Sequence, residues 1–79
     1  MRRLGTVERA AGGVAVVRVP DPDDERYDPP ALGTEVVDER LATVGRVVDV
    51  FGPVDRPYLA VTAAGGEPAG LLGSVVYGR

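Results

Sequence analysis

The chain has 79 residues, with 12 acidic and 9 basic side chains and a net charge of −3, and it lacks cysteine, histidine and lysine. These counts exclude disulfide bonds and thiolate or imidazole metal ligands, and they predict a single domain over residues 1–79. An acidic chain without a basic run is also a poor candidate for binding nucleic acid by itself, because phosphate contacts need clustered arginine or lysine.

Glycine (11 residues) and proline (7 residues) interrupt the chain often, which favours short strands over long helices. The first strand is predicted over residues 4–10. The pair Gly12 and Gly13 then supplies a hairpin turn into a second strand over residues 14–19.

The segment 20–31 is acidic and rich in proline, and it is predicted to be a surface loop. Its aspartates invite comparison with a calcium-binding loop. The glycine and the distal glutamate that an EF-hand loop needs are missing, however. We therefore expect a solvated charge run with no metal or other cofactor, and we assign no function to the acidic residues 21–28.

The segment 35–51 supports two interpretations. Apolar residues recur in it at helical spacings of four, three, four and three: Val37, Leu41, Val44, Val48 and Phe51. The central Gly45 and the many valines oppose a helix, so two strands over residues 34–38 and 43–50 are favoured. Gly45 is then expected to permit a bulge or a close approach of two strands.

Two prolines bracket the segment 52–57, which is predicted to be a turn because each proline fixes φ and removes a hydrogen-bond donor. A strand over 58–62, a small flexible segment over 63–70 and a last strand over 71–77 complete the chain. Six short strands at close spacing predict an all-β fold in the form of a small closed β-barrel, which removes exposed sheet edges.

No constellation of residues suited to catalysis stands out. Without histidine, cysteine or lysine, the usual nucleophile–base pairs are unavailable. One carboxylate pair, Asp38 with Asp49, remains conceivable, but charged residues beside turns usually face solvent or cap backbone donors. We expect a protein that is not an enzyme and has no catalytic residues.

No stretch of the chain approaches the roughly 18 consecutive apolar residues of a membrane span. The two arginines near the N-terminus are followed by residues 5–9, which do not form the apolar region of a signal peptide. A cytoplasmic protein that does not bind membranes is expected.

The most specific pattern runs from Pro29 to Leu59. It contains Leu-Gly-x-x-Val-x-Asp (residues 32–38), Gly-Arg-Val-x-Asp-Val-Phe-Gly-Pro-Val (residues 45–54) and Arg-Pro-Tyr (residues 56–58). Together these motifs resemble the archaeal Gar family of box H/ACA guide ribonucleoproteins. Residues 4–7 and 72–77 also suit that family, so the resemblance covers most of the chain. Residues 50–58 are its specific part, because PRC-type barrels carry strings similar to Gly-Arg-Val-x-Asp-Val.

The resemblance implies a six-stranded β-barrel of the translation-factor/reductase–isomerase type. It implies that the subunit docks on the catalytic domain of a dyskerin-like pseudouridine synthase, near a mobile thumb loop, and assists substrate loading and product release in rRNA modification. The particle also contains a Nop protein and a kink-turn-binding protein, with which contact is mostly indirect. No direct contact with the guide RNA is implied.

The residues expected to bind the synthase lie around the turn after the fourth strand: Val50, Phe51, Gly52, Pro53, Val54, Arg56, Pro57 and Tyr58. Apolar groups exposed at a turn suit a protein interface. For Phe51, packing inside the barrel is weighed slightly above an interface role, whereas for Gly52, Pro53 and Val54 the interface is favoured. Arg56 is expected to form an ion pair at the rim, and Tyr58 to bury its ring with the hydroxyl in water.

The alternative function is that of a PRC-barrel-type adaptor in ribosome or tRNA maturation, which would bind a ribosomal protein. That alternative gives no reason for the Phe-Gly-Pro-Val and Arg-Pro-Tyr strings at residues 51–58. An enzymatic function would need a site contributed by another chain.

Overall fold

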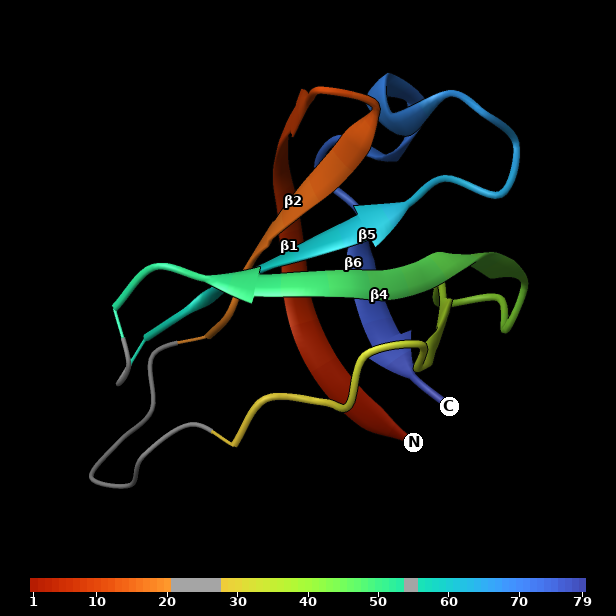
Figure 1. The fold of residues 1–79 in the computed structure, drawn as a ribbon. Helices are drawn as coiled ribbons and strands as arrows, with labels where there is room; N and C mark the ends of the chain where they lie inside the picture. Colours follow the sequence, from red (N-terminus) through yellow and green to blue (C-terminus); the bar gives the residue numbers. More distant parts are fainter. Residues whose placement is uncertain (21–27, 54–55) are drawn as a thin grey trace.

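The structure is a computed structural model that describes residues 1–20, 28–53 and 56–79. The described residues form six strands and one short 3₁₀-helix (Figure 1): β1 (Arg2–Ala11), β2 (Val14–Arg18), β3 (Glu35–Val37), β4 (Thr43–Phe51), β5 (Tyr58–Thr62), η1 (Pro68–Leu71) and β6 (Val75–Gly78). Within these ranges there is no helix of the length and apolarity needed to cross a membrane.

The sheet closes on itself. Its strands are all antiparallel to their neighbours and follow one another in the order β1-β2-β5-β4-β3-β6, with β6 pairing back to β1. Closure brings the two ends of the chain together, because Arg2 lies opposite Gly78 (Figure 1). The prediction of an all-β fold whose six strands close in a ring is confirmed.

The ambiguous segment folds as the two strands β3 and β4 and not as a helix. The side chains at helical spacing do not share a buried face, because Val37 is fully buried whereas Leu41, Val48 and Phe51 are exposed. The helical spacing is therefore coincidental, and the strand prediction is confirmed.

The C-terminal part departs from the prediction. The segment expected to be flexible contains the start of η1, where Pro68 stands in the first turn, a position that proline suits. The last strand begins at Val75 and not at residue 71. Before it, the backbone N–H of Gly73 donates to the carbonyl of Val7 over 2.9 Å, while Gly73 itself has a φ of +80°. The turn at Gly73 therefore occupies the residues before Val75, and β6 begins later than predicted.

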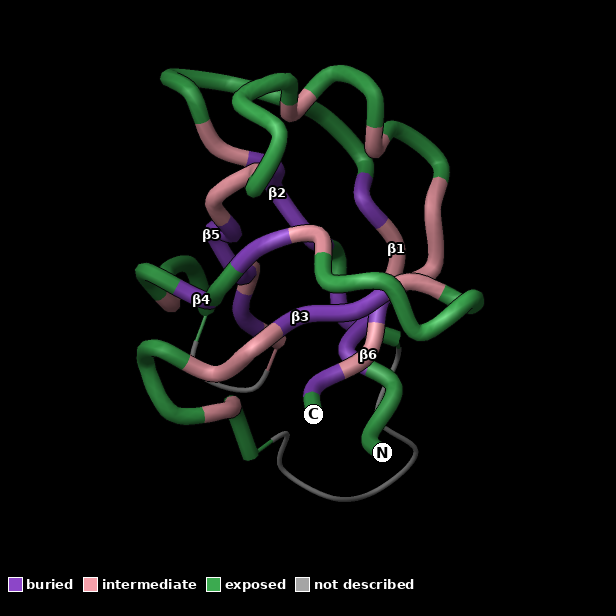
Figure 2. The backbone as a smooth tube through the Cα atoms, turned by 90° about the vertical axis from the view of Figure 1, so that its right-hand side faces the viewer, coloured by how far each residue is buried: buried purple, intermediate pink, exposed green. Residues whose placement is uncertain are grey.

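The core fills the inside of the ring. Every strand contributes at least one inward apolar side chain, and Figure 2 shows the buried stretches in the middle of the strands. The buried cluster consists of Leu4, Val7, Ala15, Val17, Val19, Val36, Val47, Leu59, Val61 and Val76. Removing these aliphatic groups from water is the dominant force that holds so small a sheet closed.

A β-bulge in β4 decides which side chains face outward at the end of that strand. Val47 lies opposite Val61, and both are buried. The register shifts between Val47 and Asp49, after which Phe51 lies opposite Tyr58. Strict alternation from Val47 would direct Phe51 inward, so the extra residue of the bulge turns Phe51 to the outside.

Gly45 allows β4 to pass close to the end of β5. A Cβ atom at this position would lie 1.5 Å from the carbonyl oxygen of Thr62, a distance at which no side chain fits. The backbone N–H of Arg46 donates to Oγ1 of Thr62 over 3.1 Å, and that of Ala64 donates to the carbonyl of Val44 over 2.7 Å. The expected close approach of two strands at Gly45 is confirmed.

Candidate functional site

β4 ends and β5 begins at one corner of the ring, which we call the β4–β5 corner and define as residues 50–53 and 56–58 (Figure 1). The rings of Phe51 and Tyr58 stack there, with centroids 5.6 Å apart and planes inclined by 24°. Because the two residues lie directly opposite each other on neighbouring strands, their side chains share the outer face of the ring.

The turn residue Gly52 supports this aromatic pair. Its φ of +93° lies in the region that favours glycine. A Cβ atom at Gly52 would lie 3.1 Å from Cδ2 of Tyr58, so the Gly52 backbone packs directly against the Tyr58 ring. The backbone N–H of Arg56 donates to the carbonyl of Pro53 over 3.2 Å, which joins the two sides of the corner. The corner is therefore a preformed surface.

Three corner residues offer exposed surface. Phe51 is 37% exposed, and Gly52 and Pro53 are exposed beside it. Phe51 does not belong to the buried core, so the interpretation of Phe51 as a core residue is wrong. Val48 is 45% exposed and adds apolar surface on the same strand. The sequence analysis did not include Val48 among the contact residues, because Val48 lies before the specific segment 50–58.

The other expected contact residues are less accessible. Val50 is half-buried and packs against the core, and Arg56 and Tyr58 are also half-buried. Pro57 is buried, so it offers little surface to a partner. Val54 lies outside the described residues.

The two carboxylates considered as a catalytic pair are engaged separately. Oδ1 of Asp38 accepts hydrogen bonds from the backbone N–H groups of Arg40, over 2.8 Å, and Ala42, over 3.0 Å. The hydrogen bond from Ala42 is the main cause that lowers the pKa of Asp38. Asp49 accepts from the backbone N–H of Val50 over 2.8 Å, near the other end of β4. Each carboxylate caps the backbone, and the two do not form a shared site.

The described ranges contain no group of three or more histidine, cysteine, aspartate or glutamate residues that would hold a metal ion. The acidic residues 21–27, which were compared with a calcium loop, lie outside those ranges.

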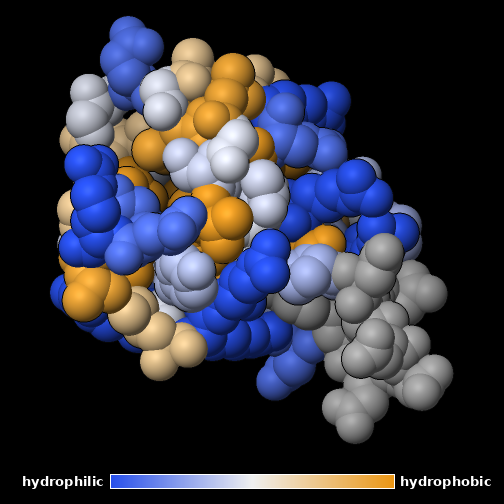
Figure 3. All heavy atoms as spheres, turned by 180° about the vertical axis from the view of Figure 1, so that it is seen from behind, coloured by the Kyte–Doolittle hydropathy of each residue, from blue (hydrophilic) through white to orange (hydrophobic). Residues whose placement is uncertain are grey.

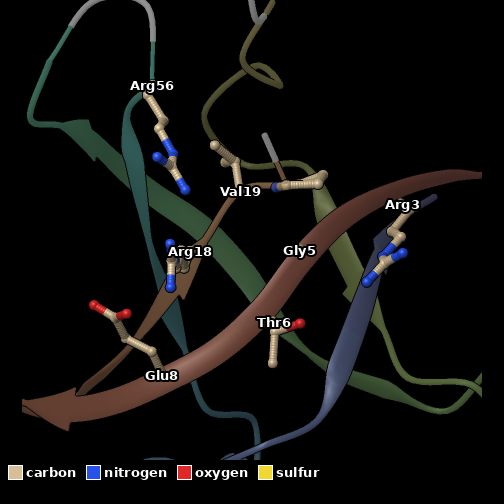
Figure 4. A pocket seen from close by; sticks show the side chains of 8 residues that line it. Arg3, Gly5, Thr6, Glu8, Arg18, Val19 and Arg56 are labelled. Atoms are coloured by element: carbon tan, nitrogen blue, oxygen red, sulfur yellow. The ribbon is translucent and has the colours of Figure 1, made fainter. Parts of the chain in front are cut away.

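A hollow of about 330 Å³ on the outer face of β1 and β2 was not anticipated. Arg3, Thr6 and Glu8 line it from β1, Arg18 from β2 and Arg56 from the residues before β5. In Figure 4 the side chains of Arg18 and Arg56 extend toward the same space, with Glu8 beside Arg18 and Arg3 across β1. The arginines are far apart in the sequence, so no local pattern signals the hollow.

The surface seen from behind carries small hydrophobic patches separated by hydrophilic residues (Figure 3).

A scan against protein-family models finds no match to the chain. No curated protein matches its sequence.

Proposed function

We propose that this chain is the non-catalytic accessory subunit of a box H/ACA-type, RNA-guided pseudouridine synthase complex, and that it binds the catalytic domain of the synthase through the β4–β5 corner. One observation carries the proposal. Within the segment of most specific resemblance to the archaeal Gar family, the described residues 50–53 and 56–58 form a corner that presents a stacked aromatic pair on the outer face. The closed ring of six strands is compatible with the barrel of the translation-factor/reductase–isomerase type that this family implies.

A docking role accounts for features of the corner that folding alone does not require. The bulge in β4 leaves Phe51 partly in water, although burying an aromatic ring would stabilise so small a core. Rigid aromatic groups on a preformed surface are typical centres of binding energy in protein interfaces. Exposed Gly52 and Pro53 extend this surface, and Arg56 lies at its edge, where an ion pair affects orientation more than affinity.

The resemblance to the Gar family also implies a mode of action beside a mobile loop of the synthase. The chain has no histidine, cysteine or lysine, so in this proposal the synthase supplies the general acid–base chemistry. A subunit that binds beside a mobile loop changes how long that loop spends open or closed. Such a change affects substrate entry and product release, which limit the turnover of many enzymes, and leaves the chemical step as it was.

Kinetics of the reconstituted particle test the proposal. The dyskerin-like synthase of the same organism would be assembled with guide RNA, with and without this chain. We expect the chain to raise the multiple-turnover rate several-fold and to change the single-turnover rate by less than about twofold. An unchanged multiple-turnover rate would count against the proposal, and specific binding to a ribosomal protein instead would favour the PRC-type adaptor.

A further inference from the structure

The hollow on β1 and β2 gathers positive charge on an acidic chain. Arg3, Arg18 and Arg56 line it together with one carboxylate, Glu8, although the whole chain has a net charge of −3. Within the described ranges, neither Arg3 nor Arg18 takes part in an ion pair shorter than 4.0 Å. Arg56 already interacts within the chain, so only the guanidinium groups of Arg3 and Arg18 are considered as ligands for an external anion.

The hollow is continuous with an aromatic surface. Thr6 lies opposite Arg18, Arg18 lies opposite Tyr58, and Tyr58 lies opposite Phe51. Residues directly opposite each other on antiparallel strands share a face, so these four side chains form one row across β1, β2, β5 and β4. Tyr58 therefore stands between the arginine side of the row and Phe51.

Arginines, a hydroxyl group and an aromatic ring in one row suit a phosphate-bearing ligand with a flat base. A guanidinium group presents paired donors that match a phosphate, and a hydroxyl such as that of Thr6 donates to the same oxygens. Proteins that bind single-stranded nucleic acid place arginines along the phosphate backbone and stack bases on nearby aromatic rings. An acidic protein segment would satisfy the arginines without requiring an aromatic ring beside them, whereas Tyr58 lies opposite Arg18.

We propose that the hollow binds backbone phosphate of a single-stranded RNA, with a neighbouring base against Tyr58. The absence of a basic run argued against nucleic acid at the level of sequence. The fold changes that conclusion, because it brings arginines from separate segments to one hollow. The inference goes beyond the docking role and does not rest on it.

Fluorescence anisotropy of a labelled single-stranded RNA of about ten nucleotides tests the site on the isolated chain. Two phosphate contacts predict a slope of about −1.4 for the logarithm of affinity against the logarithm of salt concentration. Arg18→Gln should weaken binding about tenfold at low salt and make the slope shallower by about 0.7. Arg40→Gln removes the same charge from a side chain that is 88% exposed and outside the hollow, and it should change neither quantity.

Several results would overturn the RNA site. One is the absence of RNA binding by folded wild type at low salt, and another is an equal loss of affinity in Arg40→Gln. Competition by a polyglutamate peptide as strong as that by unlabelled RNA would assign the hollow to a protein partner. Displacement of the RNA by inorganic phosphate at the same phosphate concentration would assign it to a free anion. Circular dichroism of each variant verifies that the fold is intact.

The two proposed surfaces are separable by their variants. Arg18→Gln should lose RNA affinity and still co-purify with the synthase. Pro53→Asp, at an exposed corner residue outside the row, should lose synthase binding and keep the salt slope of the wild type. Loss of synthase binding in Arg18→Gln with unchanged RNA affinity would contradict the inference and leave the docking role standing.

Discussion

Phe51 and Tyr58 face each other across the β4–β5 pair, with ring centroids 5.6 Å apart on the outside of a closed sheet. Stacked aromatic pairs contribute about 0.5–1.5 kcal/mol beyond the area they bury. The pair therefore stabilises the corner before any partner arrives. A surface that is already ordered loses less conformational entropy on binding, which favours affinity.

Replacement of Gly45 in β4 by alanine should destabilise the fold strongly. In Gly45→Ala the new methyl group would overlap the carbonyl of Thr62, so β4 has to move away from β5. We expect the free energy of unfolding to fall by about 3 kcal/mol or more, a large share of the total stability of so small a domain. Urea unfolding followed by circular dichroism measures this loss.

Gly65→Ala is the matched control for Gly45→Ala. No atom lies within 4 Å of a Cβ built at Gly65, and its φ is outside the left-handed region. The stability of this variant should be unchanged or raised by less than about 1 kcal/mol, because alanine reduces the freedom of the unfolded chain. Equal losses in the two variants would refute the steric role of Gly45.

The cap formed by Asp38 predicts a specific pH dependence. Its pKa is lowered in the folded state, chiefly by the hydrogen bond from Ala42, so its contribution to stability is complete above the unfolded pKa of about 3.9. That contribution is lost as the pH falls through the lower, folded pKa. Asp38→Asn keeps an acceptor oxygen and does not titrate. The melting temperature of wild type should therefore decrease more steeply below about pH 4 than that of the variant.

Melting curves of both proteins at matched pH values isolate Asp38, since the other carboxylates titrate in both. A difference in melting temperature that stays constant down to about pH 2 would show that the lowered pKa does not contribute to stability.

Leu41 carries backbone strain at the turn before β4. It is the one non-glycine residue with positive φ, +67°, in the described part of the chain, and its side chain is 52% exposed. Left-handed backbone costs most residues about 1–2 kcal/mol, and asparagine tolerates it better. Leu41→Asn should therefore raise the free energy of unfolding by about 0.5–1 kcal/mol in urea titrations.

The same substitution at Leu72 gives the comparison. Leu72 is also 52% exposed, but its φ is −54°, so Leu72→Asn relieves no strain and should bring no gain. A stability of Leu41→Asn below that of wild type would mean that the leucine side chain contributes more than the strain costs.

Most strands were predictable because their signals are local. Valine-rich runs and the turn at Gly12 and Gly13 fix the first hairpin, and Gly45 distinguishes two strands from a helix in the ambiguous segment. The orientation of Phe51 was not predictable, because one extra residue in the β4 bulge reverses the alternation and leaves no mark in the composition. The short helix η1 was not predicted, because its four residues show no apolar periodicity.

The candidate site was predictable only in part. Residues 50–58 stand out as a motif, but burial of Pro57 and exposure of Val48 depend on how β4 and β5 pair. The hollow could not be predicted from the sequence. Arg3 and Arg18 share it because Thr6 pairs with Arg18, and that pairing depends on a β-bulge between Val7 and Arg9 that no sequence pattern marks.

Co-purification of the tagged chain with the dyskerin-like synthase of the same organism tests the docking role of the corner most directly. Phe51→Asp places a charge on the exposed edge of the aromatic pair, and Leu72→Asp places the same charge at an exposed leucine beside η1. Wild type and Leu72→Asp should co-elute with the synthase, whereas Phe51→Asp should not, with circular dichroism unchanged in all three. Failure of folded wild type to co-elute over a range of salt concentrations, or undiminished co-elution of Phe51→Asp, would contradict synthase binding at this corner.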